Sequence, residues 1–259
     1  MKNPKIYIVL PLLDYREHLV TDFLTKNNFL LNLSDVKIFL KTTEKIIINH
    51  SKIISYAEPD KSIYDAWNQS VTQLNIIQKG QPYFVAFCGI DDVLNEQFLS
   101  NAQLKLASDI DILFGDIVVN VNNKLKYKHA NPNSTMLTSS KNKSWDIYHP
   151  GMVMSSKLFN EFSFDIDYSL AADFKFFTEI SNRLNLKTCH LRFSQAVINI
   201  NGISNQPNAR KIYFSELRRI ERECDIDVTG FNWAIENLKL KILKSPIGGF
   251  VRNIYWAMK

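Results

Sequence analysis

The sequence predicts an α/β protein in which a mostly parallel sheet is flanked by helices and followed by a basic helical C-terminal extension. Short apolar runs typical of buried strands alternate with stretches of helical periodicity up to residue 92, which is the pattern of a parallel sheet with crossover helices. The run of residues 83–90 leads directly into Asp91 and Asp92. From Gln206 onward the chain carries 10 Lys or Arg and 6 Asp or Glu, although the net charge of all 259 residues is only +5.

The individual elements follow from the apolar pattern and its interruptions. Strands are predicted at residues 6–12, 36–40, 52–56, 83–90, 111–120, 125–129, 151–154 and 197–200. Helices are predicted at residues 15–31, 60–78, 96–107, 169–184, 208–224 and 229–243, with Asp60 and Ser169 as N-caps. The polar residues 131–144 predict a mobile loop. We expect one α/β domain over residues 1–205 and the extension over residues 206–259.

Composition narrows the classes of function. The charge is too evenly balanced outside the extension for a nucleic-acid-binding domain, so no nucleic-acid partner is expected. The three cysteines, Cys88, Cys189 and Cys224, form no metal or redox motif, which indicates a reduced, cytoplasmic setting. No apolar run approaches the ~20 residues that span a bilayer, and residues 6–13 are too few for the apolar region of a signal peptide.

Asp91 and Asp92 are the first candidates for chemistry. They follow a strand that is predicted to be buried on both faces, and the carboxyl ends of such strands border the ligand crevice in open α/β sheets. Two adjacent carboxylates repel each other unless a cation offsets their charge, and Mg2+ or Mn2+ is the natural partner of carboxylate oxygens. The alternative is an ordinary turn after a strand, where Asp is common.

A series of motifs resembles, in order, those of bacterial family 2 glycosyltransferases, of the type used in capsule, O-antigen and exopolysaccharide assembly. The first is Glu58-Pro59-Asp60-Lys61-Ser62-Ile63-Tyr64-Asp65-Ala66-Trp67-Asn68, and the second is Phe87-Cys88-Gly89-Ile90-Asp91-Asp92-Val93-Leu94, which is similar to the family's variant DxD motif. The later ones are Phe114-Gly115-Asp116, His149, Leu158-Phe159, Phe164-Asp165, Ala171-Ala172-Asp173-Phe174 and Gly202-Ile203-Ser204. The resemblance covers roughly residues 5–205.

The resemblance implies a GT-A fold and an inverting transfer from a nucleotide-sugar, with a UDP-sugar as the first candidate donor. Asp91 and Asp92 would hold the donor diphosphate through Mn2+ or Mg2+, which stabilises the charge that develops on the leaving group. The other residues that would line the donor pocket are Asp60, Lys61, Asp65 and Asn68. From the residues alone, Asp60 is equally a helix N-cap, and a solvated helix face is the default interpretation of Asp65 and Asn68.

Asp173 is the predicted catalytic base. On its helix it projects from the middle of an apolar arc, where a carboxylate is costly unless it has a partner or lies in a cleft. The resemblance places the family's base here, where it would take the proton of the acceptor hydroxyl that attacks the anomeric carbon. The alternative is a first-turn acid stabilised by the helix dipole. The resemblance also places His149 and Asp116 on the acceptor side, although a lone histidine is more often structural.

One segment departs from the family pattern. The family usually ends its second strand with Asp-Gly-x-Ser-x-Asp-Gly-Thr, which helps to bind the nucleobase, whereas residues 38–45 contain no Asp-Gly. This departure favours an alternative function, a degenerate glycosyltransferase-like module that binds a nucleotide or a protein partner without turnover. The retention of Asp91, Asp92 and Asp173 argues against it. A sugar nucleotidyltransferase is less well supported, because no Gly-rich phosphate loop follows the first strand.

The C-terminal extension allows two interpretations. Residues 229–259 combine five basic side chains and five aromatic rings with a single acid, Glu236, a composition that suits the surface of an anionic membrane. The resemblance adds that acceptors in the family are often lipid-linked glycans at the cytoplasmic face of the inner membrane. Alternatively, the apolar side chains pack on the catalytic domain or join two copies of the chain. A peripheral membrane contact and a homo-oligomer are therefore both expected alternatives.

Overall fold

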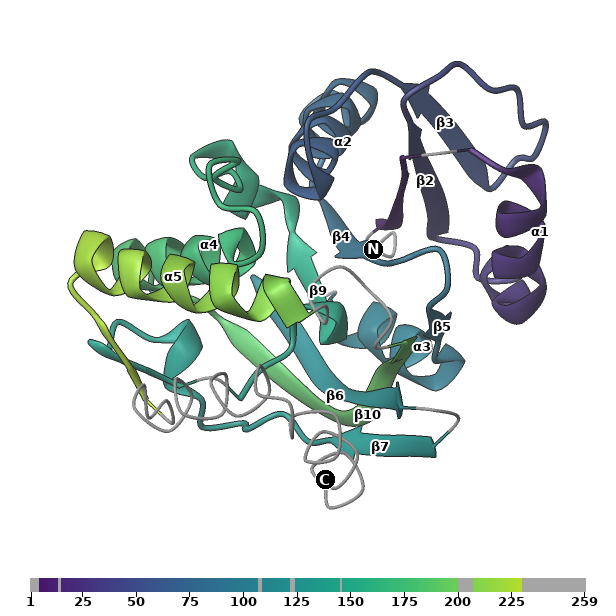
Figure 1. Cartoon of the computed structure of the whole chain (residues 1–259). Helices are drawn as coiled ribbons and strands as arrows, with labels where there is room; N and C mark the ends of the chain where they lie inside the picture. Colours follow the sequence, from purple (N-terminus) through teal and green to yellow (C-terminus); the bar gives the residue numbers. More distant parts are fainter. Residues whose placement is uncertain are drawn as a thin grey trace.

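The structure, a computed structural model, describes residues 5–13, 15–106, 109–121, 124–144, 146–199 and 207–229. A curled, mostly parallel sheet lies between two layers of helices (Figure 1). The predicted α/β class is therefore confirmed. The predicted helix at residues 229–243, the rest of the tail and the Gly202-Ile203-Ser204 motif lie outside the described residues. Within the described ranges, no helix has the length and apolar character needed to cross a membrane.

The strands of the sheet follow the order β3-β2-β1-β4-β9-β6-β10-β5, with β7 paired to β6. The first half consists of the parallel strands β1 (Lys5–Leu12), β2 (Val36–Thr42), β3 (Ile53–Ala57) and β4 (Tyr83–Phe87). The second half consists of β6 (Ile112–Val121), its antiparallel partner β7 (Lys124–Lys128) and the parallel β10 (Thr188–Asn199), with the short β5 (Val93–Leu94) at the edge. The connecting strand β9 (Met152–Ser155) runs antiparallel to both β4 and β6. The strands β4 and β6 therefore point the same way and end at the same edge of the sheet.

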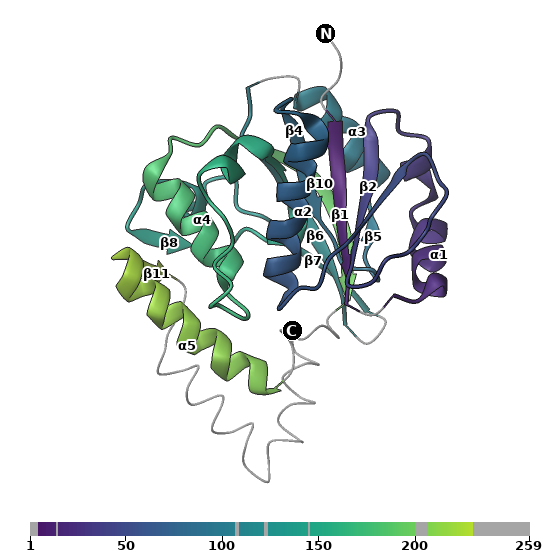
Figure 2. The same ribbon diagram turned by 90° about the horizontal axis from the view of Figure 1, so that it is seen from above.

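Helices cover both faces of the sheet with apolar side chains. On one face, α1 (Glu17–Lys26) and α3 (Glu96–Lys105) close a core that includes Phe23 and Phe98. On the other face, α2 (Ile63–Gln78), α4 (Ala172–Arg183) and α5 (Pro207–Cys224) close a second core, rich in aromatic rings. Figure 2 shows α5 running beside α4 on the side away from α1. The helix predicted at residues 208–224 therefore contributes to the same core as α2 and α4, while the domain boundary at residue 205 stays a prediction.

The N-cap predicted for α2 was wrong. The helix begins at Ile63, and its N-cap is Ser62, whose hydroxyl oxygen accepts the backbone N–H of Asp65 at 3.2 Å. Asp60 lies two residues too early and is bound elsewhere, because its carboxylate pairs with the buried Lys41 at 2.9 Å.

The N-cap predicted for α4 was also wrong. The helix begins at Ala172 after the N-cap Ala171, which provides no side-chain hydrogen bond. Ser169 does not cap the helix, because its N–H and its hydroxyl both donate to the carboxylate of Glu216 on α5, each at 2.7 Å.

Two segments are more regular than their composition suggests. Strand β10 begins at Thr188 rather than residue 197, because it pairs with β6 along its length, with register shifts near Ser194. Residues 131–144 are not an irregular loop, since they contain the 3-10 helix η2 (Thr135–Leu137) and strand β8 (Asn142–Ser144), which pairs with β11 (Asp227–Thr229). Three further 3-10 helices are η1 (Asn28–Leu31), η3 (His149–Gly151) and η4 (Ser156–Asn160).

Candidate active site

The candidate site lies at the edge where β4 and β6 end. In the register of the sheet, Val85 of β4 and Ile112 of β6 both face Met154 of the intervening β9. Phe87, the last residue of β4, is therefore within two residues of the level of Asp116 on β6. Neighbouring strands lie ~4.8 Å apart, so Phe87 at the end of β4 and Asp116 within β6 are on strands ~10 Å apart. The sheet thus brings the predicted carboxylates that follow β4 and the one on β6 to one edge.

The loop that carries Asp91 and Asp92 is anchored at two points. The backbone N–H of Gly89 donates to Asp92 Oδ2 at 2.7 Å. Asn27, fully buried at the end of α1, donates to the Asp92 carbonyl at 3.1 Å and accepts the N–H of Leu94 at 2.7 Å. A Cβ on Gly89 would lie 3.1 Å from Asp91 Oδ1 and 3.4 Å from Asp92 Oδ2, so a side chain at this position would crowd the two carboxylates.

The two carboxylates differ in environment. Asp91 is exposed, whereas Asp92 is only 7% exposed. Burial, opposed by the hydrogen bond from Gly89 and aided by the charge of Asp91, raises the pKa of Asp92 from its ordinary value of 3.8 to about 7. A buried carboxylate beside another acid favours the approach of a cation.

The donor set fits a cation that is shared with a phosphate ligand. Among the residues that the structure describes, no three His, Cys, Asp or Glu side chains lie close enough together to enclose a metal ion. Mg2+ sites that serve phosphate substrates do not need such a cage, because the ion takes one or two carboxylates and completes its shell with water and phosphate oxygens. Asp91 and Asp92 match this arrangement.

Asp173 lies in the first turn of α4, in a surrounding of mostly apolar side chains. Its Oδ1 accepts the N–H of Phe174 at 2.8 Å and lies 3.4 Å from the hydroxyl of Tyr64 on α2. The side chain keeps 27% of its surface accessible. Burial raises the pKa of Asp173 to about 6, against the opposing effect of these hydrogen bonds. The carboxylate is therefore ionised at neutral pH, accessible, and close to the pKa that suits a general base.

His149, in η3, links Asp173 to the end of β4. Its Nδ1 is 4.0 Å from Asp173 Oδ2, and its ring centroid is 5.6 Å from that of Phe87. The imidazole is packed among aromatic rings that include Trp67 at 4.7 Å and Phe177 at 5.7 Å. Burial lowers the pKa of His149 to about 3, so the ring is neutral at physiological pH. Asp173, His149 and the end of β4 thus form one continuous site.

Of the residues predicted to bind the donor, Asp60 and Asp65 use their carboxylates in contacts within the protein, whereas Lys61 takes part through its backbone N–H. The ammonium group of the fully buried Lys41 binds Asp60 at 2.9 Å and the Thr42 carbonyl at 3.1 Å. The carboxylate of Asp65 accepts the N–H of Lys61 at 2.9 Å. Lys41 stands at the end of β2, in the segment that lacks Asp-Gly. Contact of these three residues with a donor stays a prediction.

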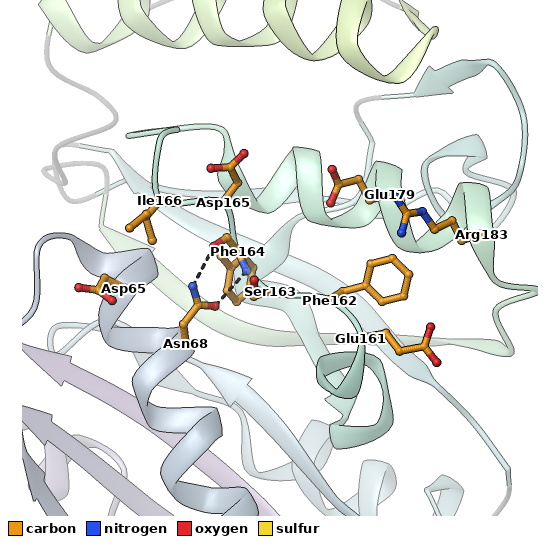
Figure 3. A pocket seen from close by; sticks show the side chains of 10 residues that line it. All are labelled: Asp65, Asn68, Glu161, Phe162, Ser163, Phe164, Asp165, Ile166, Glu179 and Arg183. Carbon is orange, nitrogen blue, oxygen red and sulfur yellow. Dashed lines mark hydrogen bonds between the residues drawn. The ribbon is translucent and has the colours of Figure 1, made fainter.

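Asn68 joins α2 by two hydrogen bonds to the loop that precedes Asp173. Its amide donates to the Phe164 carbonyl at 2.8 Å and accepts the Phe164 N–H at 2.9 Å (Figure 3). The same side chain lines a cavity of about 490 Å³, together with Asp65, Glu161, Phe162, Ser163, Phe164, Asp165, Ile166, Glu179 and Arg183. This cavity lies between α2 and α4, and neither the Asp91–Asp92 pair nor Asp173 lines it. The cavity that Asp65 and Asn68 line thus includes none of the carboxylates predicted to bind the metal or to act as the base.

The carboxylate of Asp116 lies beside two histidines and accepts a hydrogen bond from a backbone N–H group. Its Oδ2 lies 2.9 Å from Nδ1 of His129, and its Oδ1 accepts the N–H of Ala130 at 2.9 Å. His190 Nε2, on β10, is 3.7 Å from Oδ1. Burial alone would raise the pKa of Asp116, but the bonds from His129 and Ala130 outweigh it, so the pKa lies below its ordinary value. Asp116 is therefore ionised, and its role toward an acceptor stays a prediction.

Several residues of the site were missed at the level of sequence. Tyr64 lies inside a recognised motif, but its contact with Asp173 depends on how α2 and α4 pack. Asn27 and Lys41 carry no local signal, because their importance arises from burial beside distant segments. Glu216 lies beyond the part of the chain that resembles the family.

The comparisons with known proteins agree with the α/β architecture. No protein-family model and no curated protein sequence matches the chain. A crystal structure of S. aureus TarS is 14% identical, with a TM-score of 0.54, over 95% of this chain and 45% of that chain. The TarS 1-349 structure in complex with UDP-GlcNAc is 14% identical over 95% of this chain and 75% of that chain, with a TM-score of 0.55.

A mannosyltransferase structure is similar to the same degree. The mannosyltransferase PcManGT from Pyrobaculum calidifontis, in complex with GDP-Man and Mn2+, is 12% identical over 86% of this chain and 64% of that chain, with a TM-score of 0.55. This chain spans less than half of the length of the longer TarS structure. At these identities the likeness shows the fold alone. That fold is the one shared by these nucleotide-sugar-binding structures, the GT-A fold expected from the sequence motifs.

Proposed function

We propose that the protein is an inverting, metal-dependent glycosyltransferase that moves a sugar from a nucleotide-sugar to a glycan acceptor. The observation that carries this proposal is the environment of Asp173, an accessible carboxylate whose burial raises its pKa to about 6 at the edge where β4 ends. The GT-A fold and the neighbours with bound UDP-GlcNAc and GDP-Man support the choice of donor class.

In the proposed reaction, Asp173 and the Asp91–Asp92 pair have different roles. The acceptor hydroxyl oxygen attacks the anomeric carbon of the donor sugar, its proton passes to Asp173, and the bond from that carbon to the nucleoside diphosphate breaks. Asp173 is suited to take this proton because burial raises its pKa to about 6, which makes it a stronger base than an ordinary carboxylate, while the hydrogen bond from Tyr64 favours its ionised form. A divalent cation held by Asp91 and Asp92 would supply positive charge to the departing diphosphate.

The finer assignments follow the resemblance. We infer a UDP-sugar as the first donor to test, because one neighbour holds UDP-GlcNAc. A lipid-linked acceptor, surface polysaccharide synthesis and a site of action at the cytoplasmic face of the inner membrane remain part of the same proposal, supported by the family motifs. Recognition of the donor's nucleobase must differ from the family pattern, because the segment at the end of β2 lacks Asp-Gly and contains Lys41, which binds Asp60.

The Lys41–Asp60 pair favours one second candidate function, a module that binds a nucleotide or protein partner without turnover. A buried lysine that binds Asp60 at 2.9 Å removes that carboxylate from direct contact with a donor. The two functions differ in one measurable respect, since a non-catalytic module binds a nucleotide-sugar and leaves it intact.

The test is a thermal-shift screen of UDP-, GDP-, dTDP- and CMP-sugars with Mn2+, because a ligand that binds only the folded state raises its Tm. We expect at least one donor to raise the Tm, EDTA to abolish the effect, and Mn2+ to restore it. Asp92→Asn should lose the metal-dependent shift, whereas Asp22→Asn, an exposed acid on α1, should keep it. If no nucleotide-sugar stabilises the protein at millimolar concentration, the proposed function is wrong.

A further inference from the structure

Helix α5 holds the segment of backbone that leads into Asp173. The carboxylate of Glu216 accepts four hydrogen bonds from consecutive residues of this segment. Its Oε1 binds the N–H and the hydroxyl of Ser169, both at 2.7 Å, and its Oε2 binds the N–H of Leu170 at 2.9 Å and of Ala171 at 2.8 Å. The backbone N–H groups of residues 169–171 and the hydroxyl of Ser169 thus all donate to Glu216, which is distant in sequence.

These bonds fix the start of α4. Ala171 is the N-cap of this helix and offers no side-chain oxygen, and the Glu216 carboxylate from α5 binds the backbone N–H of Ala171 and of the two residues before it. A negative charge at this position is also stabilised by the dipole of α4. Charge-assisted bonds to backbone N–H groups are short and strong. Because Asp173 follows Ala171 by two residues, these bonds restrain the backbone that carries its carboxylate.

Glu216 also acts on Asp173 through its charge. The titratable groups that influence Asp173 are Tyr64 from α2, His149 from η3, and Tyr213 and Glu216 from α5. Of these, Glu216 carries a negative charge, and that charge raises the pKa of Asp173 in addition to burial.

A separate set of contacts docks α5 without Glu216. The hydroxyl of Tyr168 donates to Glu223 at 2.6 Å, and Lys175 of α4 binds the same carboxylate at 3.1 Å. Leu217 and Ile220 are fully buried against the core. Loss of the Glu216 carboxylate is therefore expected to leave the helix in place.

We propose that Glu216 is a positioning residue, which binds the backbone of residues 169–171 from α5 and thereby sets the place of the Asp173 carboxylate. The inference rests on the proposed function, in which Asp173 is the catalytic base. It assigns to α5, which lies beyond the segment that resembles the family, a direct part in arranging the reaction.

The test compares Glu216→Gln with Glu221→Gln in the full chain. Glu221 is a matched control, because it is on the same helix and its carboxylate accepts a backbone N–H, that of Val228 at 3.1 Å, away from Asp173. For Glu216→Gln we expect hydrogen exchange of the Leu170 and Ala171 amides to accelerate at least ~10-fold. We also expect a lower pKa of Asp173 in a carboxyl 13C NMR titration, whereas Glu221→Gln should match the wild type in both.

Turnover provides the third readout. With a donor that is turned over, Glu216→Gln should lower kcat up to ~100-fold, since small misplacements of a reacting group have effects of this size, and should leave the donor Kd unchanged. Glu216→Asp, which keeps the charge, should retain the pKa of Asp173 and lie between the wild type and Glu216→Gln in kcat.

The outcomes separate the inference from the proposed function. Unchanged amide exchange and an unchanged Asp173 titration in Glu216→Gln would overturn the positioning role. If Glu216→Gln does not fold, the same measurements are made on Glu216→Asp. Exchange of the Leu170 and Ala171 amides at the wild-type rate in that variant would equally overturn the positioning role. If exchange and titration change as expected but the wild type turns over no donor, the structural coupling stands and the proposed function fails.

Discussion

Replacing Asp92 by Asn should stabilise the metal-free protein at alkaline pH. Asp92 is buried, and its pKa is raised from 3.8 to about 7, so the folded state disfavours its charge while the unfolded state does not. Near pH 3 and below, both states are protonated and there is no penalty. As pH rises from ~4 to ~7, the penalty grows, and above pH ~7 it is fully present.

The size of this effect follows from the pKa. One unit in pKa corresponds to ~1.4 kcal/mol, so the change from 3.8 to about 7 corresponds to at most ~4 kcal/mol. An Asn at this position can still accept the Gly89 N–H through Oδ1, but its own N–H groups would need partners, which costs ~1–3 kcal/mol if they find none. We therefore expect Asp92→Asn to raise the free energy of unfolding by ~1–3 kcal/mol at pH 8.

The assay is urea denaturation in EDTA at pH 4, 6 and 8, with the wild type, Asp92→Asn and the exposed-site control Asp22→Asn. The advantage of Asp92→Asn should be small at pH 4, grow to pH 7 and then level off. Asp22→Asn should stay within ~0.5 kcal/mol of the wild type. A variant that is less stable than the wild type at pH 8 would refute the reasoning, because it would mean that the buried charge is already compensated within the protein.

Four further predictions follow. Asp173→Asn should lower kcat by ~10²- to 10⁴-fold with an unchanged donor Kd, and near wild-type turnover would identify another base. Because the pKa of Asp173 is about 6, kcat/KM of the wild type should fall ~10-fold per unit below pH ~6, whereas a flat profile down to pH 5 would contradict this. Asn68→Ala, which removes both bonds to Phe164, should lower the free energy of unfolding by ~1–3 kcal/mol, against ~0.5 kcal/mol or less for the exposed Thr72→Ala. In co-sedimentation, the full chain should bind anionic vesicles in a salt-sensitive way and lose most binding when truncated after Lys244, and a full chain that stays in the supernatant at low salt would make the tail an element of packing or assembly.

The fold was predictable where the apolar pattern is decisive. The predicted strands β1, β2, β3, β4, β6 and β7 were confirmed. Four of them, β1, β2, β4 and β6, contain runs of buried residues, whereas β7 contains none. Most of β10 was missed, since residues 188–196 mix polar and apolar types and become a strand only by pairing with β6. Strand β8 was missed for the same reason, because its partner β11 lies more than 80 residues away.

The candidate site was predictable only in part. Asp91, Asp92 and Asp173 are recognisable from motifs, because their residue types and spacing are local properties. The partners that determine their chemistry are not local. Asn27 reaches the Asp92 loop from α1, and Glu216 reaches the turn before Asp173 from α5, so neither contact could be inferred before the packing was known.

The N-caps failed for a related reason. Asp60 and Ser169 are good capping residues, but each makes a stronger contact elsewhere, with Lys41 and with Glu216. A residue caps a helix only if its side-chain oxygen binds a free N–H group of the first turn. Whether that oxygen is instead bound by another residue depends on tertiary structure.

The most direct test of the central claim is the release of nucleoside diphosphate from a stabilising nucleotide-sugar with Mn2+, followed by mass spectrometry for the wild type and Asp173→Asn. Water can serve as a slow acceptor, so the measurement does not require the natural glycan. If the protein is a glycosyltransferase with Asp173 as its base, the diphosphate is released in a metal-dependent way with cleavage of the bond to the anomeric carbon, at a rate at least ~100-fold lower in Asp173→Asn. A donor that binds tightly but stays intact with the wild type, or equal rates for the two proteins, would contradict it.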